Sequence, residues 1–395
     1  MDRIRRLRNP IREYAWGSHM ALAELTGRPA PTASPEAELW MGAHPSAPSQ
    51  VETEAGPVSL IEWIRRAPEA VLGRATAQRF GGELPFLFKV LAPRRALSIQ
   101  VHPDAERARR GFERENAAGL AVDDPRRNYR DSNPKPELIC ALGCFTALCG
   151  FRGHIEVVEG LERLGVPRLA AAAGELRAGG EAGIARLVGA LLARDAEERR
   201  SLADEVADVV RGRESESPEL AEIAELSRQY PGDLGIVFPL LLNLVELAPG
   251  EALFLGTGEI HAYLRGVGVE LMANSNNVLR GGLTEKHVDV LELLDTLTFR
   301  EGPPKVIEPG EDASYSTPTP YFRLERLDTA SGRVTGDADR GVEILLCTSG
   351  SVHVVREADA QEIDLERGAS ALAPSAAGAY RIEGAGVVHR AGVPH

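Results

Sequence analysis

The sequence predicts a mainly β protein in which one β unit is interrupted by helices and followed by a second, smaller β-barrel or sandwich. Short apolar runs separated by proline and glycine fill residues 1–150 and resume after residue 232. Between them, residues 154–230 are rich in alanine, glutamate and arginine, with apolar residues at helical spacing. Beyond residue 320, short β-type runs recur at regular spacing with glycine turns.

Length and charge set limits on the class of protein. The chain has 395 residues, which is enough for two or three domains, because single cores rarely grow beyond roughly 250 to 300 residues. Its formal charge of -13 argues against a nucleic-acid partner, although a small anionic substrate needs only a few local cations. No apolar segment follows the charged N-terminus, and the most apolar stretch, 236–247, is shorter than the roughly 20 residues that span a bilayer. We therefore expect a cytoplasmic protein with no membrane, nucleic-acid or obligate protein partner.

The first β region contains two clear apolar runs, at residues 84–91 and 138–145, which we predict to be strands. Residues 60–64 and 104–116 have the character of helices. This region is not self-contained, since another strand of the expected unit comes much later in the chain.

The central region has the pattern of a helical insertion. Apolar side chains repeat at helical spacing in residues 184–191 and 202–210. Asp195 or Ser201 is suited to cap the second of these helices, and Ser217, followed by proline and glutamate, is suited to start a third. We interpret the charges of this region as a solvated outer face.

The β pattern then resumes and continues to the C-terminus. We expect a helix at 283–294 capped by Thr284, and a connection at 302–319. The expected strands of this half of the chain are residues 237–247, 252–256, 269–272, 321–327, 341–348, 351–356 and 368–373. The sequence therefore predicts three segments. A catalytic β unit is formed in two parts by residues 1–152 and 232–308, a helical insertion spans 153–231, and a C-terminal β-barrel spans 309–395.

Alternating polar residues in one short strand suggest a metal site. In residues 97–104, Ser98, Gln100 and His102 share one face of the strand, while the apolar Ile99 and Val101 share the other. A polar face that carries an imidazole is typical of a metal-binding strand.

Further oxygen and nitrogen donors lie far along the chain. Glu137 opens a second apolar run, just after Lys135, and His261 shares a strand face with Tyr263. Each residue alone has an ordinary alternative as a hydrogen-bonded core residue. Together they would be costly to bury without a metal, and a mixed nitrogen and oxygen set without thiolate suits a catalytic zinc or a related divalent ion.

A pair of cations brackets a glycine bend further on. Arg280 and Lys286 flank Gly281 and Gly282, where we expect the helix at 283–294 to begin. A guanidinium beside free backbone N–H groups is suited to bind an anion, although two solvated cations are the alternative. Neither a Walker A loop nor a dinucleotide-binding fingerprint is present.

The chain has four cysteines, which are too few for a disulfide scaffold. Cys140, Cys144 and Cys149 lie in one apolar stretch with no zinc-ribbon spacing. We expect these three to be buried, reduced and structural.

Six motifs together resemble one enzyme family, the type I phosphomannose isomerases. The likeness extends from residue 10 to about residue 290, and the motifs occur in order along the chain. They are YAWGS at 14–18, AELWMGAHP at 37–45, PFLFKVLAPRRALSIQVHPD at 85–104, NPKPELICAL at 133–142, GEIHAYL at 258–264 and VELMANSNNVLRGGLTEK at 269–286.

This resemblance implies a cupin-type jelly roll interrupted by a helical domain and followed by a second barrel. It also implies one Zn²⁺ per chain, bound by Gln100, His102, Glu137 and His261. The implied activity is the reversible, metal-dependent isomerisation of mannose 6-phosphate and fructose 6-phosphate through an enediolate.

The resemblance also suggests roles for residues around the metal. Arg280 matches an active-site arginine of the family and is expected to stabilise developing negative charge. Lys135 and Glu270 are alternative candidates for moving the proton between C2 and C1 of the sugar. The remaining pocket position that the resemblance implies is Tyr263, and we expect Lys286 and Ser98 to bind the phosphate.

Two departures from the family pattern leave a second function open. Asn276 replaces an aspartate of the family, and Glu285 places a negative charge next to Lys286 in the sequence. Loss of a carboxylate at 276 would favour a non-catalytic, sugar-phosphate-binding regulatory relative. A cupin iron oxygenase is a third candidate, which Gln100 disfavours because non-haem iron sites use histidines with one carboxylate.

Overall fold

The computed structural model describes residues 1–177, 179–332, 334–337 and 339–394. Its strands form three sheets, in which the paired strands are antiparallel. Two sheets enclose an apolar interior as a jelly roll, and the third contains most of the C-terminal strands. The mainly β fold class predicted from the sequence is thus confirmed.

The first sheet of the jelly roll has seven strands in the order β15-β11-β8-β13-β6-β3-β2. Residues 86–91 are buried along their whole length, because other elements cover both faces of this sheet, and this explains the nearly continuous apolar run. The strands are β2 (Ile11–Arg12), β3 (Glu38–Gly42), β6 (Phe86–Leu91), β8 (Glu137–Ala141), β11 (Ala252–Leu255), β13 (Gly268–Ala273) and β15 (Val306–Ile307).

The second sheet of the jelly roll has five strands in the order β10-β9-β12-β7-β14. The two sheets pack face to face through an apolar cluster that includes Ile139 and Leu253 from one sheet and Phe145 and Tyr263 from the other. The second sheet consists of β7 (Ile99–Val101), β9 (Phe145–Phe151), β10 (Leu242–Leu247), β12 (His261–Arg265) and β14 (Leu279–Gly282).

Helices cover the outer face of the five-stranded sheet. Asp195 caps one of them through the N–H of Glu198, and Ser217 caps another through the N–H of Leu220, as predicted. The elements are α6 (His154–Leu164), α7 (Pro167–Leu176), α8 (Gly180–Leu192), α9 (Ala196–Val210), α10 (Pro218–Gln229) and the 3₁₀ helix η1 (Leu234–Leu240). The predicted strand at 237–247 was therefore wrong in its first part, where Pro239 lies within η1.

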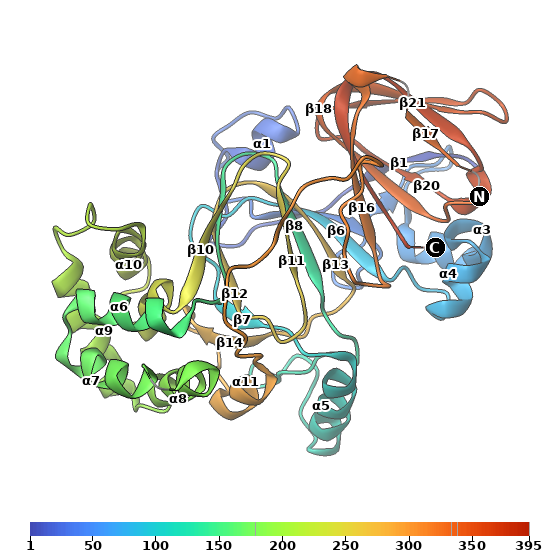
Figure 1. Cartoon of the computed structure of the whole chain (residues 1–395). Helices are drawn as coiled ribbons and strands as arrows, with labels where there is room; N and C mark the ends of the chain where they lie inside the picture. The colour runs from blue at the N-terminus through green and yellow to red at the C-terminus, as the bar shows by residue number, and fades with distance from the viewer. Residues whose placement is uncertain (178, 333, 338, 395) are drawn as a thin grey trace.

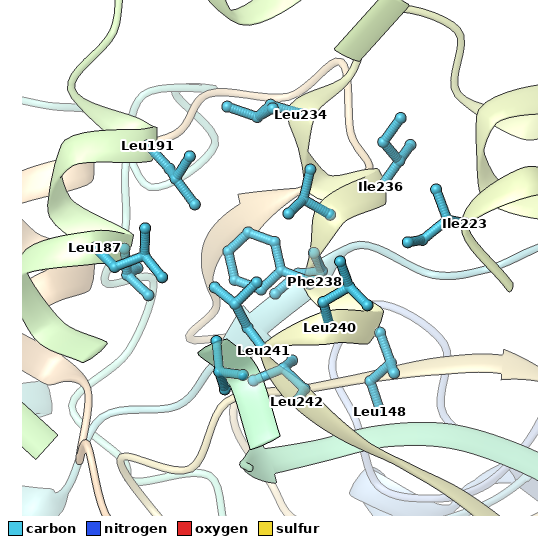
Figure 2. Packing of buried hydrophobic residues seen from close by; sticks show 14 of the residues in the cluster. Leu148, Leu187, Leu191, Ile223, Leu234, Ile236, Phe238, Leu240, Leu241 and Leu242 are labelled. Atoms are coloured by element: carbon cyan, nitrogen blue, oxygen red, sulfur yellow. The ribbon is translucent and has the colours of Figure 1, made fainter. Parts of the chain in front are cut away.

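One hydrophobic core joins these helices to the sheet. Figure 2 shows Phe238 and Leu240 of η1 among Leu187 and Leu191 of α8, with Leu148 of β9 close by. In Figure 1 the helices α6 to α10 accordingly lie beside β10, at one end of the molecule. Since the helices and the sheet share this core, the helices hold the outer face of the sheet in place.

The third sheet has nine strands and packs against the outer face of the seven-stranded sheet. Figure 1 shows most of it at the end of the molecule opposite the helices. Its strands are β1 (Arg5–Arg8), β4 (Gln50–Val51), β5 (Val58–Ser59), β16 (Arg323–Asp328), β17 (Val334–Gly336), β18 (Glu343–Arg356), β19 (Glu362–Glu366), β20 (Ser370–Ala373) and β21 (Tyr380–Gly392).

Two features of this sheet differ from the sequence-based prediction. Strands β1, β4 and β5 fall in the predicted segment 1–152, but they join the C-terminal strands, with Arg5 opposite Leu372. An apolar pattern indicates that a segment is a strand and not which strand it pairs with. In addition, the two strands expected at 341–348 and 351–356 are one strand, β18, because a bulge after Cys347 bends it without ending it. The other predicted segment boundaries remain predictions.

The remaining helices are short and lie around the sheets. The longest of them confirms the helix predicted at 104–116, and Asp104 caps it through the N–H of Arg107. They are α1 (Ala21–Leu25), α2 (Leu60–Arg66), α3 (Pro68–Leu72), α4 (Arg74–Arg79), α5 (Ala105–Ala117), α11 (Val290–Thr296) and the 3₁₀ turns η2 (Thr329–Ser331) and η3 (Ser375–Ala377).

The helix predicted at 283–294 begins later than expected. It is α11, capped by Asp289, whereas Leu283 has a left-handed φ of 54° and Thr284 accepts a hydrogen bond from the N–H of Lys286 in a turn. The predicted helix N-terminus between Arg280 and Lys286 was therefore wrong. Left-handed backbone at a leucine has no signal in the sequence, because this conformation is unfavourable for a branched side chain.

Two further expectations concern the cysteines and the membrane. Cys140 and Cys149 are buried as predicted, but Cys144 is exposed, because it lies in the turn between β8 and β9. Among the described residues, no helix combines the length and the hydropathy that a bilayer crossing requires.

The contact between α5 and Tyr129 yields a stability prediction. A Cβ added at Gly111 would lie 2.3 Å from Cδ2 of the buried Tyr129. We expect Gly111→Ala to destabilise the protein by about 1–3 kcal/mol despite the better helix propensity of alanine, because this packing cannot relax cheaply. Urea unfolding would measure the change.

Gly174→Ala is the matched control. Gly174 is also helical, in α7, and apart from its chain neighbours and the backbone of its own helix no described atom lies within 4 Å of its added Cβ. This substitution should stabilise the protein by up to about 1 kcal/mol. Equal changes in the two variants would contradict the packing argument.

Candidate metal centre

Three buried side chains from three strands meet inside the jelly roll. His102 follows β7 directly, Glu137 begins β8 and His261 begins β12. One ligand atom from each lies within 4.8 Å of the others. The Nε2 atoms of His102 and His261 lie 3.2 and 3.5 Å from Oε1 and Oε2 of Glu137.

The backbone determines which imidazole nitrogen faces the carboxylate. Nδ1 of His102 lies 2.9 Å from the carbonyl oxygen of Asn277, and Nδ1 of His261 lies 3.0 Å from that of Glu259. Since a carbonyl oxygen only accepts, each Nδ1 carries the proton and donates it, and each Nε2 has a lone pair, which in His261 accepts from the amide of Gln100. Burial, together with the charge of Lys135, lowers the pKa of His102 to about 4, so this ring is neutral at pH 7.

The lone pair of His102 Nε2 therefore faces the lone pairs of the Glu137 carboxylate in the buried interior of the jelly roll. Nε2 of His102 is buried and has no hydrogen-bond partner among the described residues, and the oxygens of Glu137 opposite it are acceptors too. A cation between them removes this repulsion, which makes the geometry that of a metal site.

Gln100 extends the ligand set. Its side chain is buried, and its amide nitrogen donates to Nε2 of His261 at 3.3 Å, its cross-strand neighbour in the sheet, while the amide oxygen is the atom that can bind a metal. Two imidazoles, one carboxylate and one amide form a nitrogen and oxygen set without thiolate, which fits a catalytic Zn²⁺.

Neighbouring groups keep the carboxylate of Glu137 ionised. Burial opposes ionisation, but the charge of Lys135, with Nζ 2.8 Å from Oε1, holds the pKa of Glu137 well below its usual range. The hydroxyl of Tyr263 donates to Oε2 at 3.5 Å. The structure thus brings Lys135 and Tyr263 to the ligand set.

A second polar cluster lies on the inner face of the seven-stranded sheet. Nζ of Lys89 is 2.5 Å from Oε2 of Glu270 and 3.7 Å from Oε1 of Glu38, whose other oxygen accepts from Nε1 of Trp40. Trp40, Lys89 and Glu270 are cross-strand neighbours in β3, β6 and β13. Burial lowers the pKa of Lys89, but the neighbouring carboxylates raise it, and the net shift is upward. Burial and the charge of Glu137 raise the pKa of Glu270.

Sequence reasoning identified Glu270 but missed Lys89 and Glu38. A signal was available at Lys89, because it is the one charged residue of the apolar run 84–91. A lysine in a doubly buried strand needs an anionic partner or a ligand.

His44 is another residue that the sequence analysis did not select. Its ring packs edge-on against Trp40, with 4.9 Å between centroids, and its Nδ1 accepts from the N–H of Ser46. Burial and the charge of Lys89 lower the pKa of His44 to about 4. A hydrogen bond with Asn276 raises this pKa, but its effect is smaller. It is therefore a neutral ring near the two lysines.

Three cations gather at the edge strand of the five-stranded sheet. Arg280 lies in β14 directly opposite Gln100 and is half-buried. Burial and the charge of Arg130 lower the pKa of Arg280, while burial, Arg280 and Arg130 lower the pKa of Lys286. In the described part of the chain, none of these three cations forms an ion pair with a carboxylate.

Arg130 was also missed, because its loop has no periodic pattern. The side chain of Asn277 holds this loop, accepting from the N–H groups of Arg130 at 2.7 Å and Asp131 at 3.2 Å. The backbone of the same Asn277 accepts from His102. One buried asparagine thus ties the loop that carries a cation to a metal-ligand candidate.

The last two residues of interest are Ser98, next to a strand, and Glu285, in the turn after β14. Ser98 is half-buried, directly before β7, and forms no hydrogen bond in the described structure. Glu285 lines a cavity of ≈ 610 Å³ with Trp16, Arg95 and Tyr230, and none of the metal-ligand candidates lines this cavity. The expected repulsion between Glu285 and a bound phosphate stays a prediction.

Comparison with known proteins decides the family. The family model of the phosphomannose isomerase type I catalytic domain matches residues 4–154. The mannose-6-phosphate isomerase of Escherichia coli is 38% identical over 393 residues, which cover 98% of this chain and 99% of that enzyme. The chain belongs to the type I phosphomannose isomerases.

Other members of the family agree with this assignment. The Salmonella typhimurium mannose-6-phosphate isomerase is 40% identical and covers 93% of this chain and 94% of its own. A crystal structure of mannose 6-phosphate isomerase with bound zinc superposes with a TM-score of 0.91 at 37% identity, covering 99% of this chain and 100% of that one. The resemblance and the cupin-like fold inferred from the sequence are thus confirmed in this phosphomannose isomerase.

The lowered pKa of His44 predicts a change in how stability depends on pH. The unfolded chain binds the proton with a pKa of about 6.5, so acid favours unfolding between that value and the folded pKa of about 4. His44→Asn keeps an acceptor for the N–H of Ser46 and removes this titration. Between pH 7 and pH 5 the variant should lose about 1–2 kcal/mol less of its unfolding free energy than the parent.

Urea unfolding of both proteins at the two pH values, at equal metal content, measures this difference. Parallel losses in parent and variant would contradict a neutral, buried His44.

Proposed function

We propose that the chain is a metal-dependent aldose–ketose isomerase that interconverts mannose 6-phosphate and fructose 6-phosphate through an enediolate. The observation that carries the proposal is the meeting of the His102 and His261 lone pairs with the Glu137 carboxylate. Its support is the family, whose members at 38% and 40% identity are named mannose-6-phosphate isomerases.

The cofactor is one Zn²⁺ per chain. Its proposed ligands are Gln100, His102, Glu137 and His261, of which the last three already present ligand atoms to one another. When bound, a zinc ion acts as a Lewis acid that polarises a carbonyl or hydroxyl oxygen of the sugar. The backbone carbonyls behind both histidines keep Nε2 aimed inward.

The phosphate of the substrate is assigned to the unpaired cations. Burial and the charge of Arg130 lower the pKa of Arg280, and burial with the charges of Arg280 and Arg130 lowers that of Lys286. No carboxylate among the described residues balances these charges, and a phosphate dianion would do so. Ser98 offers a hydroxyl donor at the start of β7, the strand that pairs with β14. Arg280 stands opposite Gln100, so its charge would also stabilise negative charge that develops on a sugar held at these ligands.

Lys135 and Glu270 remain the two candidates for proton transfer. Glu270 is buried with its pKa raised, which brings the carboxyl group towards the neutral range that a general base requires. Lys135 is buried against Glu137 and is suited to donate to a sugar oxygen. Lys89 holds the carboxylate of Glu270 in position, and Tyr263 lies between the two clusters.

The alternative of a non-catalytic regulatory relative is not favoured, since full-length relatives are named as isomerases. The changed residue on which it depended, Asn276, is exposed, and its backbone N–H donates to Asp131. The cytoplasmic location and the expectations about nucleic-acid and protein partners stay predictions.

A coupled assay tests the function. Purified protein supplied with Zn²⁺ and mannose 6-phosphate should form fructose 6-phosphate. His261→Ala should abolish turnover and lower the zinc content of the isolated protein, with the circular dichroism spectrum unchanged, because this side chain supplies a ligand. His19→Ala, at an exposed histidine, should leave both unchanged.

Two results would count against the proposal. Binding of mannose 6-phosphate without turnover in the zinc-loaded protein would favour the regulatory relative. Full zinc content in His261→Ala would remove this residue from the ligand set.

The cation cluster gives a second prediction. Arg130→Gln should raise KM for mannose 6-phosphate roughly 10- to 100-fold, the equivalent of one charge-assisted hydrogen bond, with a smaller effect on kcat. Inorganic phosphate should also become a weaker competitive inhibitor. The control is Arg126→Gln, on the same loop, where the arginine is exposed and paired with Asp124. A KM that rises equally in both variants would contradict a specific role of Arg130.

A further inference from the structure

The C-terminal sheet carries a second cluster of metal-ligating side chains, away from the jelly-roll interior. It consists of His353 in β18 and of Glu362 and Asp364 in β19, all exposed. We propose that this His353 cluster binds a second divalent ion of the zinc class.

Strand register brings the three side chains to one face. His353 stands directly opposite Asp364, and Glu362 lies two residues from Asp364 on the same face of β19. Nδ1 of His353 is 2.6 Å from Oδ1 of Asp364 and 3.3 Å from Oε1 of Glu362. Ligand atoms of all three lie within 4.8 Å of one another. Bonds of about 2.0–2.2 Å to a Zn²⁺ need donor atoms roughly 3–3.5 Å apart, so small rotations complete the geometry.

The sheet holds these ligands in place. β18 pairs with β19 on one side and with β21 on the other. Val352 and Val354, the neighbours of His353, are buried on the opposite face of β18. Sites built on strands are more exact than sites on loops, because packing fixes the backbone from which each ligand extends.

The surrounding charge favours a cation. His353 stands opposite a carboxylate on each side. The neighbour in β19 is Asp364, and the neighbour in β21 is Glu383, which is paired with Arg381. The competing explanation of the short contacts is a protonated imidazole that bridges Asp364 and Glu362. The two explanations differ in whether a metal ion displaces that proton.

The ligand types select the class of ion. One imidazole nitrogen with two carboxylate oxygens, and room for water at the exposed positions, suits Zn²⁺ and similar first-row divalent ions. Ca²⁺ and Mg²⁺ prefer all-oxygen sets. Such an ion would cross-link β18 and β19 and give the C-terminal sheet a ligand of its own.

Calorimetric titration of the holoprotein with ZnCl₂ tests the proposal. The protein should carry Cys144→Ser, which removes an exposed thiol that would compete for zinc. After metal analysis has established the zinc retained at the catalytic centre, we expect one further equivalent to bind. His353→Ala and Asp364→Asn should each weaken that binding more than about tenfold, since even the loss of an outer partner of a metal ligand costs roughly 10- to 100-fold. Turnover should be unchanged.

Glu366→Gln is the matched control. Glu366 is exposed on the same face of β19, two residues beyond Asp364 and opposite Ser351, so it removes the same charge without removing a ligand. Its binding should equal that of the parent. The proposal is overturned if no further equivalent binds, if His353→Ala retains it, or if Glu366→Gln weakens it as much as Asp364→Asn does.

Discussion

The structure depends on one unfavourable arrangement, which is the meeting of imidazole lone pairs with a carboxylate inside a dry β interior. His102, His261 and Glu137 come from separate strands, and burial removes the water that would otherwise solvate them. Without a metal ion, Nε2 of His102 faces the Glu137 carboxylate with no donor between them among the described residues, and with one the three groups become ligands. The backbone contacts behind the two histidines, and the lysine against the carboxylate, are all arranged to favour the second state.

The layers of the protein follow from the need to keep this interior closed. A jelly roll with a polar site inside has little apolar interior left to stabilise it, and its outer faces must therefore be covered as well. The helices cover the five-stranded sheet through one shared core, and the C-terminal sheet covers the seven-stranded one through another. Each inner strand is consequently buried on both faces, so Lys89 and Glu270 can only exist as a pair.

Sequence reasoning predicted those features that local pattern determines. Alternation identified the face of Gln100 and His102, and spacing identified the helices with their caps at Asp195 and Ser217. It failed where a partner from another part of the chain decides the structure. The pairing of β1 with the C-terminal strands, the left-handed Leu283 and the loop that brings Arg130 to Arg280 all depend on contacts between distant segments. Motifs resembling a family identified more of the site than periodicity did, because they encode such contacts indirectly.

The pairing of the two chain ends has a consequence for biosynthesis. β1 completes its sheet by pairing with β20, and Gln361 holds the backbone of Ile4 through hydrogen bonds to both its N–H and its carbonyl oxygen. During translation, β1 is therefore made long before the strand with which it pairs. The jelly roll draws on strands made before residue 308 and can form earlier, whereas the C-terminal sheet closes only once β18 to β21 have been made.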